Sequence, residues 1–108
     1  MATGARRFLR ALFVSATIAA APGPAAAQVV CLGASNTAGA GVSQQEAYPA
    51  QLEVLLRARH YDGRVANAGI SGDTTWGMLN RLERAVPAGT RVVVLQPGGN
   101  DERHVAGI

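Results

Sequence analysis

Three short apolar runs, each ending in a polar and glycine-rich block, set the limits on how this chain folds. The first and third runs show no polar alternation, and the second is interrupted only by Asn67. Continuous apolar runs of this length are typical of parallel strands that are buried on both faces of a sheet. We therefore predict strands at residues 29–32, 65–68 and 91–95.

Between the first two runs lies a predicted loop at residues 33–46, followed by a predicted helix at residues 48–59. Leucines recur at helical spacing along this second segment, and Pro49 suits the first turn of a helix. Arg57 and Arg59 favour its C-terminal end, where the helix dipole attracts positive charge.

A second helix is predicted at residues 75–86, after a loop in which Asp73 or Thr74 caps its first turn. We place Leu79, Leu82 and Val86 on its inner face. The residues Pro87, Ala88 and Gly89 end this helix. Trp76 either lines a substrate pocket or packs the helix on the sheet, and we favour packing.

The resulting order is β-α-β-α-β, which indicates an α/β fold. Helices that connect apolar strands imply crossover connections, a parallel sheet and a three-layer α/β/α arrangement. In such a sheet all strands end at the same edge, and that edge is where open α/β proteins build their sites. The three polar blocks at residues 33–36, 67–73 and 98–101 are expected to meet there.

These blocks hold the outline of a hydrolytic site. Ser35 offers a hydroxyl nucleophile, which is weak without a base to take its proton. The Gly72 backbone N–H and the Asn100 side-chain amide are donors suited to a developing oxyanion. Taken singly, Ser35 is equally a turn serine and Asn100 an ordinary turn residue.

Nucleotide binding at the first loop is excluded on the residues. A phosphate-binding loop needs a Gly-Lys-Ser/Thr ending, and the sequence contains no lysine. A dinucleotide fingerprint would begin at Gly39 and Gly41, but Gln44 stands where the third glycine belongs.

The first 27 residues are interpreted as a secretory signal peptide, so the domain spans residues 28–108. Arginines precede an apolar run at residues 11–21, and small residues at 25–27 suit a cleavage site. The run is too short for a membrane span, which needs about 20 apolar residues. We expect an exported protein, periplasmic or secreted, with no stable membrane anchor after cleavage.

The predicted signal peptide also accounts for the net charge of +3. It holds three of the ten arginines and no acidic residue, which leaves seven arginines against seven acidic residues in the rest of the chain. No basic patch remains to favour a nucleic-acid partner. The single cysteine, Cys31, lies inside the first apolar run and is expected to be buried, with a raised thiol pKa.

Together, in this order, the three blocks resemble those of the SGNH hydrolase family, the GDSL-type lipases and esterases. The resemblance covers residues 29 to about 103. It implies that Ser35 is the nucleophile, that the oxyanion hole comes from Ser35, Gly72 and Asn100, and that Asp101 supports the third loop. It implies a flavodoxin-like sheet of order 2-1-3-4-5, a small-molecule ester or thioester substrate, and no metal or cofactor.

Two departures from the family pattern stand out. The usual Gly-Asp-Ser reads Gly-Ala-Ser, with Ala34 in place of the acid. The Asp-x-x-His spacing occurs only at Asp101 to His104, in and directly after the third block, and no separate Asp-x-x-His block follows it. His60 is expected at the surface and His104 has no family counterpart. We therefore expect the N-terminal part of a hydrolase domain, cut after its third strand. The alternative is a catalytically inactive fragment or a non-enzymatic remnant that binds acyl or glycan groups.

Overall fold

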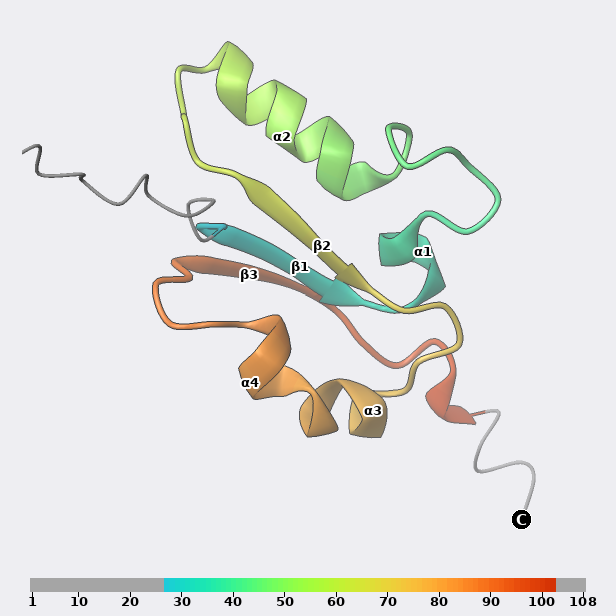
Figure 1. The fold of residues 1–108 in the computed structure, drawn as a ribbon. Helices are drawn as coiled ribbons and strands as arrows, with labels where there is room; N and C mark the ends of the chain where they lie inside the picture. Colours follow the sequence, from blue (N-terminus) through green and yellow to red (C-terminus); the bar gives the residue numbers. More distant parts are fainter. Residues whose placement is uncertain (1–26, 103–108) are drawn as a thin grey trace, which may run out of the picture.

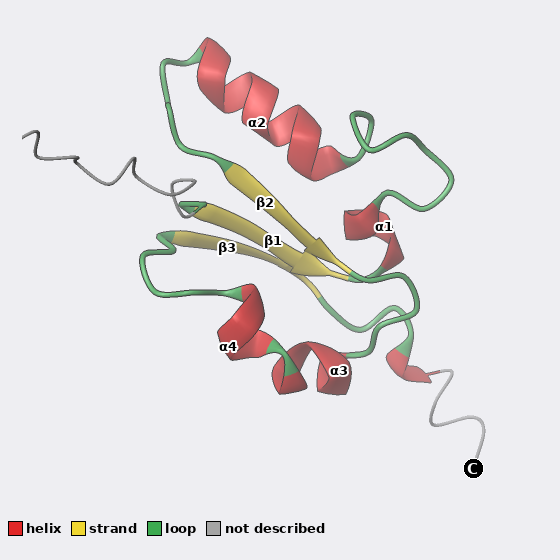
Figure 2. Cartoon of the chain, in the orientation of Figure 1, coloured by secondary structure: helices red, strands yellow, loops and turns green. Residues whose placement is uncertain are grey.

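The computed structural model describes residues 27–102, which form one parallel sheet with helices on both faces (Figure 1). Figure 2 shows the alternation of strands and helices along the chain, and it confirms the predicted α/β order. The elements are β1 (Val29–Gly33), α1 (Ser35–Ala38), α2 (Tyr48–Ala58), β2 (Val65–Gly69), α3 (Thr75–Asn80), α4 (Leu82–Ala85) and β3 (Val92–Gln96).

The strand order is β2-β1-β3, so β1 is the central strand of the described sheet. All five residues of β1 are buried, because both neighbouring strands and both helical layers cover it. Gly33 is in register with Gly69 of β2 and with Gln96 of β3. The three strands therefore end side by side.

The predicted helix at 48–59 is confirmed as α2. Pro49 lies buried in its first turn and Arg57 in its last. Glu53 pairs with Arg57 at 3.7 Å, and its other carboxylate oxygen accepts the Val65 N–H at 3.0 Å. This contact ties the helix to the start of β2.

Two local predictions were wrong. The predicted loop at 33–46 contains the short helix α1. The predicted continuous helix at 75–86 is divided into α3 and α4 at Arg81, whose backbone (φ −108°, ψ 8°) departs from helical geometry. Its side chain bonds to Asp73 and Gly33, and these contacts hold the chain at the break.

The predicted inner face of this second helical segment was also wrong in part. Met78 is the buried residue, and Val86 packs beside it, whereas Leu79 and Leu82 are exposed. Trp76 is 70% exposed, so it does not pack the helix on the described sheet. The apolar face of α3 and α4 is wider than three strands cover, since β3 is an edge of this sheet.

Candidate active site

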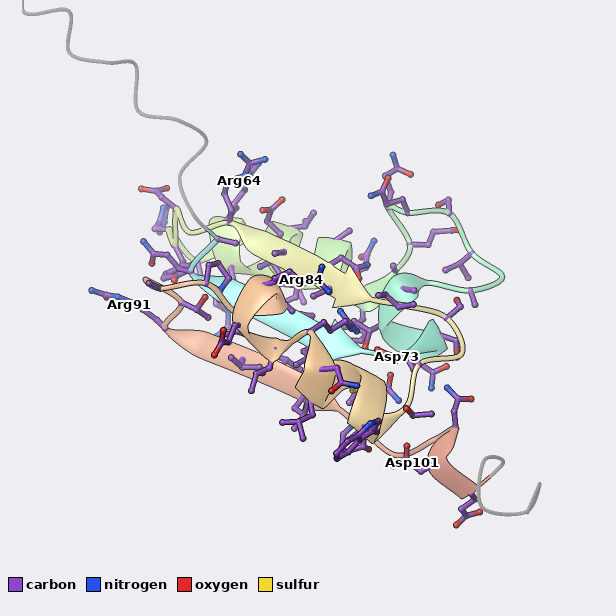
Figure 3. The ribbon with its side chains drawn as sticks, turned by 60° about the horizontal axis from the view of Figure 1, so that its bottom comes forward. Arg64, Asp73, Arg84, Arg91 and Asp101 are labelled. Atoms are coloured by element: carbon purple, nitrogen blue, oxygen red, sulfur yellow. The ribbon has the colours of Figure 1, made fainter. Side chains whose placement is uncertain are left out.

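The three polar blocks leave the sheet at one edge, because β1, β2 and β3 end in register (Figure 1). Ile70, which follows β2, donates its backbone N–H to the Gly33 carbonyl at 3.1 Å. The first and second blocks are therefore in direct contact. Figure 3 shows Asp73 and Asp101 at this end of the molecule, and Arg64 and Arg91 at the opposite end.

Ser35 is the first residue of α1 and is partly exposed. Its carbonyl accepts the backbone N–H groups of Gly39 and Ala40 at 2.9 and 3.0 Å, which closes the helix after one turn. Gly39 takes the left-handed conformation that such a helix end favours (φ 88°). Within residues 27–102, neither the Ser35 hydroxyl nor its backbone N–H has a hydrogen-bond partner.

Gly72 lies at the exposed tip of the loop between β2 and α3, with φ 82°. A Cβ added there would meet no atom within 4 Å, so the backbone conformation, and not crowding, requires glycine. The turn is closed by the Asp73 N–H, which donates to the Ile70 carbonyl at 3.1 Å. The Gly72 N–H has no acceptor among the described residues.

Asn100 is partly buried, and its Nδ2 donates to the Asp73 carbonyl at 2.7 Å. This bond brings the third block onto the second. A side-chain amide carries two N–H donors, so the second hydrogen of Asn100 is left for another acceptor. Asp101 accepts the Thr75 N–H at 2.7 Å and also bonds to the Thr75 hydroxyl. It thus links the third block to the start of α3.

The sequence left open whether Asp73 or Thr74 caps α3, and the structure assigns the cap to Thr74. The Gly77 N–H donates to Thr74 Oγ1 at 3.0 Å. Asp73 instead forms an ion pair with Arg81, Nε to Oδ2 at 2.8 Å, and accepts the Thr74 N–H at 2.9 Å. Arg81 Nη2 donates to the Gly33 carbonyl at 3.1 Å, so one arginine joins the first two blocks.

Two residues that organise this edge, Arg81 and Gln96, were not predicted from the sequence. Gln96 Oε1 accepts the Ala34 N–H at 3.1 Å from the end of β3. The available signals were a glutamine at the end of an apolar strand and an arginine among the leucines of a predicted helix. In the sequence alone, both look like ordinary polar surface residues. Only their hydrogen-bond partners in the fold show that they belong to the candidate site.

The predicted burial of Cys31 is confirmed, since its side chain is fully buried in β1. Burial raises the pKa of its thiol, and a hydrogen bond with Tyr48 offsets this in part. Burial likewise raises the pKa of the Tyr48 hydroxyl. Both groups are therefore neutral at physiological pH, which favours a structural role and not nucleophilic chemistry.

The histidine at residue 60 is exposed, as predicted, and follows the C-terminal end of α2. Because α2 leads back to the start of β2, His60 lies at the edge of the sheet opposite Ser35. His104 lies outside the described residues. Residues 27–102 contain no cluster of three His, Cys, Asp or Glu side chains placed to hold a metal ion.

Comparison with known proteins shows the class to which this fold and site belong. The model of the GDSL-like Lipase/Acylhydrolase family matches residues 31–107. The chain belongs to this family.

The chain is similar to Esterase TesA of Pseudomonas aeruginosa, with 39% identity over 100 residues. The match covers 86% of this chain and 48% of that esterase. The crystal structure of AlinE4, an SGNH-hydrolase family esterase, matches with a TM-score of 0.64 and 36% identity, over 71% of this chain and 42% of that one. The chain thus spans about half the length of the relatives it matches.

Proposed function

We propose that this chain carries the nucleophile and the oxyanion hole of a serine ester hydrolase. The observation that carries the proposal is the convergence of Ser35, Gly72 and Asn100 at one sheet edge, through the Ile70–Gly33 and Asn100–Asp73 hydrogen bonds. The unpaired N–H groups of Ser35 and Gly72 within the described residues support an oxyanion hole. Membership of an acylhydrolase family agrees with this chemistry.

In the proposed reaction, Ser35 Oγ attacks the carbonyl carbon of a small ester or thioester. A general base takes the serine proton and later delivers it to the leaving alcohol or thiol, and water then releases the acyl group. The Ser35 and Gly72 N–H groups and the Asn100 amide stabilise the oxyanion, each contributing about 3–4 kcal/mol to barrier lowering. The base is not His60, which lies at the opposite edge of the sheet.

We further propose that residues 1–27 direct export, which makes the enzyme periplasmic or secreted. Residues 1–26 lie outside the described part of the structure, so this proposal rests on the sequence pattern. Across residues 27–102 no helix has the length and apolar character needed to cross a membrane. N-terminal sequencing of the exported protein tests the proposal, which predicts a mature chain that begins at Gln28.

The function is tested with protein expressed from the complete reading frame and assayed on p-nitrophenyl acetate and butyrate. Ser35→Ala is expected to lower kcat at least about 10³-fold, because it removes the nucleophile. Ser43→Ala, in the exposed loop before α2, is the matched control and is expected to keep full activity. Hydrolysis that survives Ser35→Ala would overturn the proposal.

The second candidate is a non-catalytic acyl- or glycan-binding protein. It is favoured by the absence of any hydrogen-bonded base at Ser35 within residues 27–102. Labelling with a fluorophosphonate probe separates the two functions, because only an activated serine reacts. Mass spectrometry is expected to find the adduct on Ser35, whereas an unlabelled protein that binds a fatty acid would support the second candidate.

A further inference from the structure

The side chain of Gln96 reaches from the end of β3 into the turn that carries Ser35. Its Oε1 accepts two hydrogen bonds, from the Ala34 backbone N–H at 3.1 Å and from Thr37 Oγ1 at 3.2 Å. Ala34 directly precedes Ser35, and Thr37 follows it by two residues. One oxygen atom of a neighbouring strand therefore anchors the turn on both sides of the nucleophile.

This turn has no polar anchor of its own. Ala34 stands at the N-cap of α1 and makes no side-chain hydrogen bond. It is 2% exposed, so its N–H cannot use water as an acceptor in place of Gln96. Burying a backbone N–H without an acceptor is unfavourable. Gln96 avoids this cost only while its Oε1 stays within hydrogen-bond distance of the Ala34 N–H.

The space that Gln96 occupies is provided by Gly33, its register partner in β1. A Cβ added to Gly33 would overlap Thr37 Oγ1 and would lie 2.9 Å from Gln96 Oε1. Glycine is thus needed at this position for the contact between strand and turn.

The contact extends into a directed chain of hydrogen bonds. A hydroxyl has one hydrogen, and Thr37 gives its own to Gln96. The 3.0 Å bond between Thr37 Oγ1 and the Tyr48 hydroxyl is therefore donated by Tyr48. Asn67 Nδ2 also donates to the Thr37 carbonyl at 2.8 Å, so β2, β3 and α2 all hold the one turn. Thr37 is fully buried at the centre of this network.

We propose that Gln96 is a positioning residue for the nucleophile: through Ala34 and Thr37 it holds the turn that presents the Ser35 hydroxyl and N–H. This inference rests on the proposed function. A misplacement of about 1 Å in a reacting group costs on the order of 100-fold in rate. Loss of the anchor is therefore expected to act on kcat and to leave KM nearly unchanged.

The test uses protein from the complete reading frame and compares Gln96→Met with Gln96→Glu. Methionine keeps the length but has no comparable acceptor, whereas a carboxylate accepts both hydrogen bonds. We expect Gln96→Met to lower kcat about 10- to 100-fold with KM within about twofold, and Gln96→Glu to remain within about threefold of wild type. Gln51→Met, on the exposed face of α2, is the matched control and is expected to behave as wild type.

Amide hydrogen exchange gives a second readout that does not depend on turnover. Gln96→Met is expected to speed exchange at Ala34 at least tenfold, with little change at Val30 in the middle of β1, and Gln96→Glu is expected to restore protection. If Gln96→Met fails to fold, the pair Thr37→Val and Thr37→Ser replaces it, with the same loss and rescue expected.

Unchanged exchange at Ala34, or an equal loss of kcat in Gln96→Met and Gln96→Glu, would overturn the positioning role. Activity that persists in Ser35→Ala would instead refute the proposed function. In that case the exchange measurement still decides whether Gln96 fixes the turn.

Discussion

At the scale of single residues, Gly72 and Gly89 have the same backbone requirement in different places. Both have positive φ, 82° and 96°, and both have open space where a Cβ would lie. Gly72 is at the carboxyl edge of the sheet, and Gly89 lies in the loop that leads into β3 at the other edge. Substituting each glycine in turn therefore separates the effect of backbone strain on stability from the role of Gly72 in the candidate site.

Gly72→Ala and Gly89→Ala are each expected to lower the free energy of unfolding by about 1–2 kcal/mol, the cost of a left-handed backbone for alanine. Only Gly72→Ala is expected to lower kcat, by about tenfold or more, because the strained loop moves an oxyanion donor. Urea unfolding and p-nitrophenyl acetate kinetics measure the two effects. Equal kcat in both variants would contradict a place for Gly72 in the oxyanion hole.

Arg81 joins two blocks of the site through Asp73 and the Gly33 carbonyl. The side chains of Arg81 and Asp73 are only 13% and 12% exposed. Arg81→Met is expected to cost about 2–4 kcal/mol in unfolding free energy, because it leaves a largely buried carboxylate without its cation. Arg84→Met, the same change on the exposed side of α4, is expected to cost less than about 0.5 kcal/mol. Similar urea midpoints for the two variants would refute the role of Arg81.

At the scale of elements, α3 is a short helix whose start is fixed by contacts outside its own sequence. Thr74 caps its first turn, and Asp101 accepts the Thr75 N–H from the third block. A helix of six residues has little stability of its own. Its position next to the second block therefore depends on these caps and on the burial of Met78.

Thr74→Ala is expected to lower the free energy of unfolding by about 1 kcal/mol, since the Gly77 N–H loses its acceptor. Thr74→Ser keeps the hydroxyl and is expected to recover most of that loss. Urea denaturation of the two variants measures the difference. Equal destabilisation by alanine and serine would show that the Thr74 methyl group, and not the cap, is what matters.

At the scale of the whole molecule, the described sheet has β3 as an apolar edge. Val92 is 51% exposed and Leu95 is 57% exposed, although both belong to a strand that begins with four consecutive apolar residues. Leu79 and Leu82 extend this exposed apolar surface onto α3 and α4. An open apolar strand edge is a template for pairing with other chains.

Residues 28–108 expressed alone are therefore expected to self-associate. Val93→Lys combined with Leu95→Lys is expected to shift the protein toward monomer, because charge on an edge strand opposes pairing. Sedimentation velocity measures the change. A soluble wild-type monomer with a cooperative thermal transition would contradict the expectation.

The local sequence determined the order of the elements, the burial of β1 and the edge at which the blocks emerge. Apolar runs, helical spacing and glycine-rich ends act over a few neighbouring residues, so they can be recognised without the fold. The polar blocks supplied Ser35, Gly72 and Asn100 as candidate site residues, and the family resemblance assigned them as nucleophile and oxyanion-hole donors. The bounds of β3 shifted by one residue, and α2 ended at Ala58, within the precision of such patterns.

The tertiary structure alone decided how the blocks are held together. Gln96 meets Ala34 across 62 positions, Arg81 meets Gly33 across 48, and Asn100 meets Asp73 across 27. No local pattern encodes such contacts, because each partner is an ordinary polar residue until the sheet brings it near. The break at Arg81 and the exposure of Trp76 have the same origin, since both depend on what surrounds a helix and not on its own periodicity.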